Sequence, residues 1–162
     1  MSLCAAIALT GLYLSYLHGK RLKFLKELAS FFEELGQLCF SGTGDICLCL
    51  ERLYKKQKHN ELTFLGEILC EYKNGDNFKE VWKRSVKNNS SYLADSEVNL
   101  LLEAFSEAFG KGTREDFCKS CSDYSVVFRQ LFEKEEKKRE KSRELTVYSG
   151  VLAAAAVFFI FI

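Results

Sequence analysis

Apolar side chains recur every three or four residues along most of the chain, and no convincing run alternates polar with apolar residues. This spacing is typical of helices that bury one face. Proline, which ends or kinks helices, does not occur in the sequence. The pattern therefore predicts an all-α protein whose centre is a bundle of about six helices, with one further apolar helix at each end.

The first bundle helix is predicted over residues 20–40, because its apolar positions form one stripe at helical spacing. These positions are Leu22, Leu25, Ala29, Phe32, Leu35 and Cys39. The Ser-Gly-Thr-Gly run at residues 41–44 ends this helix, and Thr43 is placed to cap the next one. That second helix covers residues 46–54, and its apolar positions are Ile46, Cys49, Leu50 and Leu53.

The third and fourth helices are predicted to be short and amphipathic. Residues 65–72 carry one apolar stripe, and Gly75 is expected to take the left-handed conformation that often follows a helix end. The fourth helix begins near residue 78 and ends in the Asn-Asn-Ser-Ser run at residues 88–91. It carries Trp82, which we expect to anchor the core.

The fifth helix is predicted to open at residues 95–96 and to stop at Gly110. Thr113 and Asp116 resemble a capping box, in which each side chain satisfies the backbone N–H of the other residue. The sixth helix begins there and meets no glycine before Gly150. We therefore expect one continuous rod that carries the last bundle helix into the C-terminal apolar segment.

Charged residues are absent from both ends of the chain. Every Asp, Glu, Lys and Arg lies within residues 20–144, and none occurs in residues 1–19 or 145–162. Because charged side chains are costly in hydrocarbon, we expect a transmembrane helix at each end and one helical domain between them. For the first segment we expect an uncleaved anchor rather than a cleaved signal peptide, since the basic residues follow the apolar run instead of preceding it.

Basic residues flank both apolar ends on the side of the central domain. They are Lys20, Arg21, Lys23 and Lys26 after the first segment, and Lys137, Lys138, Arg139 and Arg143 before the second. Lysine and arginine accumulate on the cytoplasmic side of membrane helices. The pattern therefore predicts a cytoplasmic central domain, with both termini across the membrane.

The net charge and the lack of catalytic motifs narrow the class of function. The formal net charge is only +1, from 23 basic and 22 acidic residues, whereas a nucleic-acid-binding domain usually carries a clear basic excess. The sequence also lacks a phosphate-binding glycine loop and the GxSxG and HExxH motifs. We therefore expect no catalysis, no cofactor, no nucleic-acid partner and no small-molecule substrate.

Seven cysteines raise the question of a metal or redox site. Cys47 with Cys49, and Cys118 with Cys121, are the closest pairs, and a helical pair three residues apart can supply two ligands to zinc. Cys49 and Cys121 fall on apolar stripes, however, and buried free cysteine in a reducing compartment packs as a small apolar residue. We expect packing and no metal, and a membrane-tethered thiol or metal sensor stays open as an alternative.

Two local motifs and the overall layout resemble a known family. Residues 80–83, which include Trp82, match its tryptophan region. Residues 102–110 match an L-x-x-F-G-x-x-L-G segment, with Phe105 and Gly110 at two of its fixed positions. Together with the Lys- and Glu-rich stretch before the last apolar segment, these motifs resemble the stage III sporulation protein AB family of endospore-forming bacteria.

Four positions depart from the pattern of that family. Ser106 and Phe109 stand where it usually has glycine and leucine, Thr113 replaces a common aspartate, and Gly44 replaces a proline. The resemblance nevertheless covers most of the chain. It implies a helical fold similar to the cytoplasmic domains of the F proteins of type II secretion and type IV pilus systems.

The resemblance also implies a function. Such a protein would be a platform component of a secretion-like complex between mother cell and forespore, placed in the outer forespore membrane with its bundle in the mother-cell cytoplasm. It would dock a secretion-type ATPase and contact other sporulation channel proteins. We therefore expect a non-enzymatic scaffold required for endospore formation. The alternatives are the thiol or metal sensor, and a single-domain F-type platform subunit of a pilus or secretion system.

Overall fold

The fold is all-α throughout the part of the chain that the structure describes. The computed structural model describes residues 2–42, 45–56, 61–72, 77–89, 95–110 and 112–161, without the side chains of most residues before 16 and of those after 142. Within these ranges all regular structure is helical, with six α-helices, one short 3-10 helix and no strand. The prediction of an all-α protein is therefore confirmed.

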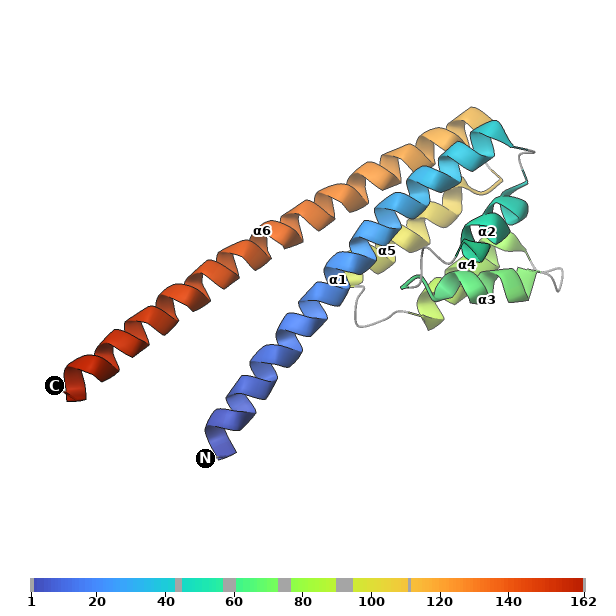
Figure 1. Ribbon diagram of the computed structural model, residues 1–162. Coiled ribbons are helices and arrows are strands. Elements are labelled where there is room, and N and C mark those ends of the chain that lie inside the picture. The colour runs from blue at the N-terminus through green and yellow to red at the C-terminus, as the bar shows by residue number, and fades with distance from the viewer. Residues whose placement is uncertain are drawn as a thin grey trace.

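Two long helices, α1 (Ser2–Ser41) and α6 (Arg114–Phe161), run in opposite directions, side by side near the short helices and separating toward the termini (Figure 1). At 1.5 Å per residue they are about 60 and 72 Å long. The continuity of α6 was predicted. For α1 the sequence analysis separated a terminal helix from a bundle helix that begins at residue 20, and this was wrong. Gly19 lies inside α1, and a single glycine weakens a helix by only about 1 kcal/mol where no proline breaks it.

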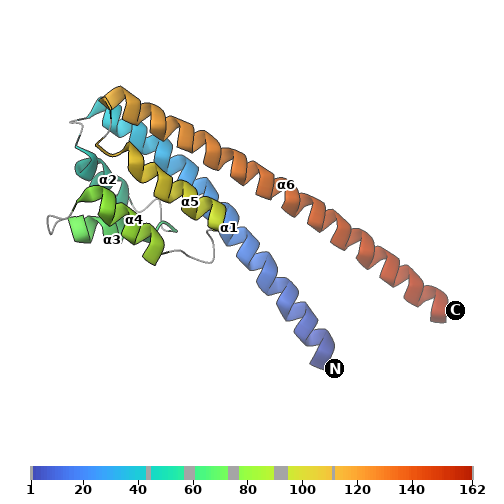
Figure 2. The same ribbon diagram turned by 180° about the vertical axis from the view of Figure 1, so that it is seen from behind.

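The shorter helices lie together on one side of α1, near the end of the hairpin away from both termini (Figure 2). In chain order they are α2 (Ile46–Lys55), α3 (Phe64–Tyr72), α4 (Phe78–Asn88), α5 (Ser96–Phe105) and the 3-10 helix η1 (Ser106–Ala108). The predicted fifth helix ran to Gly110, but the structure ends it at Phe105 and continues with η1. Gly110 then has a φ of 73°, a backbone conformation that suits glycine.

Polar side chains cap the starts of these helices. Asp45, Asn77 and Asp95 each accept hydrogen bonds from backbone N–H groups of the first turn that follows. The capping box at α6 is confirmed, because Asp116 Oδ2 accepts from Thr113 N at 2.8 Å and Thr113 Oγ1 accepts from Asp116 N at 3.2 Å. Thr43 was predicted to cap the second helix, but Asp45 caps α2 instead. Gly75, predicted to follow the end of the third helix, lies outside the described residues.

The core is built around α1. All six apolar positions predicted for its stripe are buried, and Phe24, Leu28 and Phe31 are buried beside them. A wider part of α1 is buried than one stripe, because α6 covers one side of it and the short helices cover another (Figure 1). Phe32 shows this double contact, since its ring stacks on Phe128 of α6 at 5.3 Å and meets Phe105 of α5 at 4.6 Å.

Candidate functional site

Small residues fix how α1 and α6 lie against each other. Ser125 Oγ donates a hydrogen bond to Ala29 O at 2.9 Å, and Cys118 Sγ donates to Gly36 O at 3.5 Å. A Cβ atom added at Gly36 would lie only 3.1 Å from Cys121 Cβ, so the two backbones approach closely there. These contacts set the antiparallel register of the hairpin, with residue 29 opposite residue 125.

Arg114, at the start of α6, caps the end of α1. Its Nε donates to Cys39 O at 2.5 Å, and its Nη2 donates to Phe40 O at 2.6 Å and to Gly42 O at 2.7 Å. The last carbonyl groups of a helix have no partners within it and carry partial negative charge, and α1 has no basic residue in its own last turn. Arg114 therefore joins the start of α6 to the end of α1, although the residues it binds lie more than 70 positions earlier in the sequence.

Removing the Arg114 guanidinium should loosen this tip. We expect Arg114→Gln to lower the free energy of unfolding by about 1–2 kcal/mol, because charged hydrogen bonds are lost from a site that solvent partly screens. Arg114→Lys is the control, since it keeps the charge without the fork of donors, and it should recover part of the loss. Chemical denaturation followed by circular dichroism measures both. Equal stability of Arg114→Gln and the unaltered protein would contradict a capping role.

Aromatic rings join the short helices to the hairpin. Trp82 of α4 is fully buried, as predicted, and its Nε1 donates to Leu102 O at 2.7 Å. Its ring lies 5.4 Å from Phe105, which in turn lies 5.0 Å from Tyr124 of α6. Trp82 and Phe105 thus connect α4 to α5, α1 and α6 through one chain of ring contacts.

Two basic residues that follow the first apolar segment are engaged with the bundle. Arg21 Nη2 lies 2.5 Å from Asp95 Oδ2, and Lys23 Nζ lies 3.0 Å from Glu61 Oε1. The hydrogen bond to Glu61 is the main cause that raises the pKa of Lys23. Lys20 instead lies over the ring of Tyr16, with 5.2 Å from Nζ to the ring centroid, and Lys26 is exposed.

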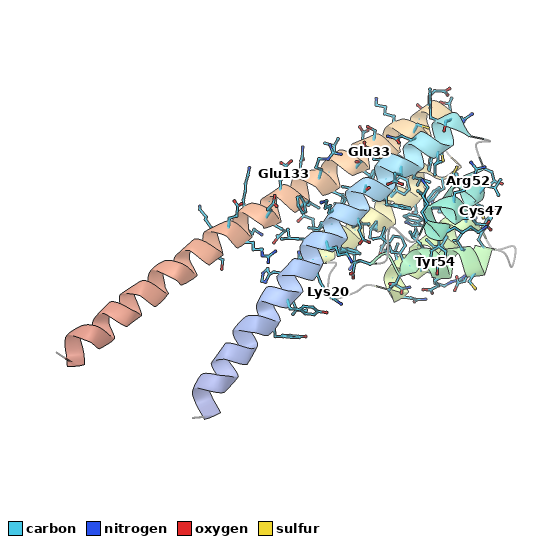
Figure 3. All side chains as sticks on the ribbon, viewed as in Figure 1. Lys20, Glu33, Cys47, Arg52, Tyr54 and Glu133 are labelled. Carbon is cyan, nitrogen blue, oxygen red and sulfur yellow. The ribbon has the colours of Figure 1, made fainter. Side chains whose placement is uncertain are left out.

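The basic residues before the second apolar segment lie along α6, beyond the short helices (Figure 3). Lys137 and Arg139 are exposed, and the side chain of Arg143 lies outside the described part. Lys138 Nζ lies 2.8 Å from Glu135 Oε1, and this charge pair between residues three positions apart supports one turn of α6. A shallow open groove on this stretch is lined by Gln130, Glu133, Lys134, Lys137, Lys138, Glu140 and Lys141.

Asp95 joins the start of α5 to α1. Its Oδ1 accepts from Val98 N at 3.0 Å and caps α5, while Oδ2 binds Arg21 of α1. Burial alone would raise the pKa of Asp95. The Val98 N–H, the Arg21 guanidinium and the nearby charge of Lys138 on α6 outweigh it, so the pKa falls below its usual 3.8.

The lowered pKa of Asp95 gives its ion pair a defined pH dependence. The stabilisation is present above the unfolded-state pKa near 3.8 and is lost as the pH falls through the lower folded-state value. We expect Asp95→Asn to lose less than about 1 kcal/mol at neutral pH, since asparagine still caps α5 and the pair is partly exposed. Unfolding measured from pH 7 to pH 2 should show the two proteins converge in acid. A constant difference at every pH would contradict the charge effect.

The cysteines noted for their spacing pack in or against the core. Cys39, Cys49 and Cys121 are buried, Cys47 and Cys118 are half-buried, and in the described part no three His, Cys, Asp or Glu side chains are placed to hold a metal ion. Burial raises the pKa of Cys39 to about 12 and also raises the pKa of Cys118 and Cys121. Thiols with raised pKa values are protonated near neutral pH, and a protonated thiol is a poor nucleophile.

Sequence reasoning missed Arg114 and Asp95 as residues that hold the long helices. An arginine in the first turn of α6 gives no sign that it binds a helix end 72 residues earlier. Asp95 was recognisable as a helix start, but its pairing with Arg21 depends on tertiary packing.

Among the helices whose residues are described, none is both long and apolar enough to cross a membrane.

Comparison with known proteins decides the family. A family sequence model described as Stage III sporulation protein AB matches residues 1–162. The chain belongs to the stage III sporulation protein AB family. The resemblance found in the sequence is thereby confirmed. No curated protein and no solved structure matches the chain.

Membership in the stage III sporulation protein AB family makes this a protein of the third stage of sporulation. The structure gives each motif residue a role in the fold. Trp82 and Phe105 lie in the core, and Gly110 lies in the turn before α6. Ser106, which stands where the sequence analysis noted a usual glycine, is buried in η1. Among the described residues its hydroxyl has no hydrogen-bond partner, and neither has that of Ser85.

Proposed function

We propose that this protein is a membrane-anchored, non-enzymatic platform component of a secretion-like complex between mother cell and forespore. In this proposal residues 1–19 and 145–162 anchor the protein in the outer forespore membrane, and the helical bundle lies in the mother-cell cytoplasm. The bundle docks a secretion-type ATPase and contacts other sporulation channel proteins. It acts through binding and position, without a nucleic-acid or small-molecule ligand.

The observation that carries the proposal is the continuity of α1 and α6. Each long helix passes without a break from the bundle into a terminal segment free of charged residues. Both termini lie at the same end of the hairpin, away from the short helices (Figure 1). A bundle attached through two continuous helices is suited to pass force or position from a docked partner to parts inside a membrane.

The charges near the anchors support the orientation. The basic residues of α6 between positions 137 and 143 follow the positive-inside pattern on the side of the bundle. The family relationship supports the sporulation complex, since the matching family is a stage III sporulation protein. Docking of a secretion-type ATPase follows from the likeness to F proteins that the sequence motifs imply.

Cysteine labelling in sporulating cells tests the topology. In a background with Cys4→Ala and Cys70→Ala, we expect Asn89→Cys and Lys138→Cys to resist a membrane-impermeant maleimide in intact cells and to react after the cells are opened. Both positions belong to the part proposed to face the mother-cell cytoplasm. Efficient labelling from outside would overturn the orientation and the cytoplasmic bundle with it.

Co-purification tests the partner. Full-length protein solubilised from sporulating cells should carry a secretion-type ATPase, and a strain lacking the protein should form no heat-resistant spores. Normal spore formation without the protein would contradict its role as a required platform component.

A further inference from the structure

The register of the hairpin conflicts with two full-length anchors that enter the membrane at the same depth. Ala29 and Ser125 lie opposite each other, as the 2.9 Å hydrogen bond between them shows. Twenty residues from Ser125 along α6 is Leu145, where the second charge-free segment begins. Twenty residues from Ala29 toward the N-terminus is Leu9. The first segment, however, is free of charge up to Gly19, about 15 Å nearer the bundle.

The two helices separate toward the termini (Figure 1). If both meet the membrane at similar tilts, positions equally far from the Ala29–Ser125 pair lie at similar depths, and only one of the two segments can set the membrane boundary. With the boundary at Gly19, α6 would place nine charged residues, those between positions 135 and 144, at the depth of the hydrocarbon. With the boundary at Leu145, α1 places residues 10–19 outside the hydrocarbon, and these include no Asp, Glu, Lys or Arg. The second placement is far less costly, because charged side chains are strongly disfavoured in hydrocarbon.

The side chains of α1 suit the headgroup layer. Tyr13 and Tyr16 are 62% and 58% exposed and lie three residues apart, on one face of α1. Tyrosine is enriched where a membrane meets water, since its ring is apolar and its hydroxyl is polar. Lys20 lies over the ring of Tyr16, whereas Arg21 and Lys23 turn to acidic groups of the bundle. At the same level α6 exposes Lys134, Lys137 and Lys141, and the acidic residues Glu133, Glu136 and Glu140 are exposed among them.

We infer that residues 10–19 of α1 lie in the headgroup layer of the membrane rather than in its hydrocarbon core. Tyr13, Tyr16 and Lys20 form a collar there with Lys134, Lys137 and Lys141 of α6, and the collar contacts the headgroups of anionic phospholipids. Clusters of basic residues next to membrane helices attract such headgroups through charge, and the tyrosines fix the depth. The inference rests on the proposed membrane anchoring and specifies its depth and its lipid.

Tryptophan quenching by brominated lipids measures the depth. In full-length protein reconstituted into bilayers, we expect Leu9→Trp to be quenched more by bromines at acyl carbons 6 and 7 than by bromines at carbons 11 and 12. Ala155→Trp, ten residues beyond Leu145 and near the bilayer centre, is the control and should show the opposite order. The native Trp82 is buried in the bundle and adds a constant signal. Stronger quenching of Leu9→Trp by the deeper bromines would overturn the inference.

Spin-labelled lipids measure the headgroup preference. The unaltered protein should immobilise labelled phosphatidylglycerol in preference to labelled phosphatidylcholine. The triple change Lys134→Gln, Lys137→Gln and Lys141→Gln should bring this ratio close to one. Lys55→Gln, Lys87→Gln and Lys119→Gln, three exposed lysines of the bundle, remove the same charge and should leave the ratio unchanged. A preference that survives the first triple change, or that inorganic phosphate abolishes in the unaltered protein, would contradict a lipid collar.

Alkaline carbonate extraction separates failure of this inference from failure of the proposed function. If carbonate releases the unaltered protein from membranes, the anchoring itself is wrong and both ideas fall. If the protein stays in the membrane while Leu9→Trp reports the bilayer centre, the proposed platform function stands and only the shallow placement of α1 is refuted.

Discussion

Trp82→Ala should lower the free energy of unfolding by about 3–5 kcal/mol and the melting temperature by about 6–20 °C. The Trp82 side chain is fully buried, and its ring lies within 6 Å of the rings of Phe64, Phe105 and Phe109. Its removal leaves a cavity between α4 and α5 and takes away the donor bound to Leu102 O. Because these rings attach the short helices to the hairpin, the short helices should detach first.

Trp82→Phe is the matched variant. It keeps an aromatic ring in the core and loses the indole N–H, so we expect a loss well below that of the alanine variant. Thermal and denaturant unfolding of the full-length protein in detergent, followed by far-ultraviolet circular dichroism, gives both values. If Trp82→Ala unfolds at the temperature of the unaltered protein, the ring cluster is not what holds the short helices to α1 and α6.

Lys138→Pro should leave the bundle folded and membrane-inserted but abolish spore formation. Proline removes one backbone hydrogen bond and its ring clashes with the preceding turn, at a cost of about 3 kcal/mol within α6. Residue 138 lies on the exposed stretch between the bundle and the second charge-free segment. A kink there would uncouple the tilt of the bundle from the membrane, which the proposed platform function requires. The readout is the count of heat-resistant spores.

Lys138→Ala is the control for the side chain, because it removes the pair with Glu135 and keeps α6 continuous. We expect it to form spores almost normally, since an exposed pair contributes less than about 1 kcal/mol. Membrane extraction and unfolding must show that the proline variant is inserted and folded. Normal spore formation by Lys138→Pro would show that this stretch is a tether, and rigid coupling would have to be abandoned.

Most of the helical architecture could be predicted because it rests on local signals. The stripe from Leu22 to Cys39, the helix start at Asp95 and the capping box of Thr113 with Asp116 depend on side chains within a few residues of each other. A helix predicted from such local patterns forms in the folded protein when no stronger long-range contact opposes it. Residues 1–19 and 20–40 were assigned to separate helices because the composition changes between them, but no residue there ends a helix, and α1 runs through.

The candidate site was less predictable from the residues alone. The basic residues were found by their position beside apolar segments, but Arg21 and Lys23 have specific partners on α5 and before α3. The four cysteines noted for their spacing differ in burial, since Cys49 and Cys121 are buried and Cys47 and Cys118 are half-buried. The burial of Cys49 and Cys121 agrees with their places on apolar stripes. The partners of Arg21 and Lys23 do not follow from spacing, because they depend on which elements pack beside α1.

The sequence by itself determined the helical class and the absence of charge at both ends, which are properties of periodicity and composition, and the family, which rests on motifs and on a match over the whole chain. Only the tertiary structure decided which residues lie opposite one another in the hairpin, and with them the offset between the two charge-free segments. A helix pattern repeats every few residues and allows many registers that differ by a turn. Contacts such as Ala29 with Ser125 and Arg114 with the end of α1 select one of them, because small residues allow close approach in this register and the last carbonyls of α1 need a donor.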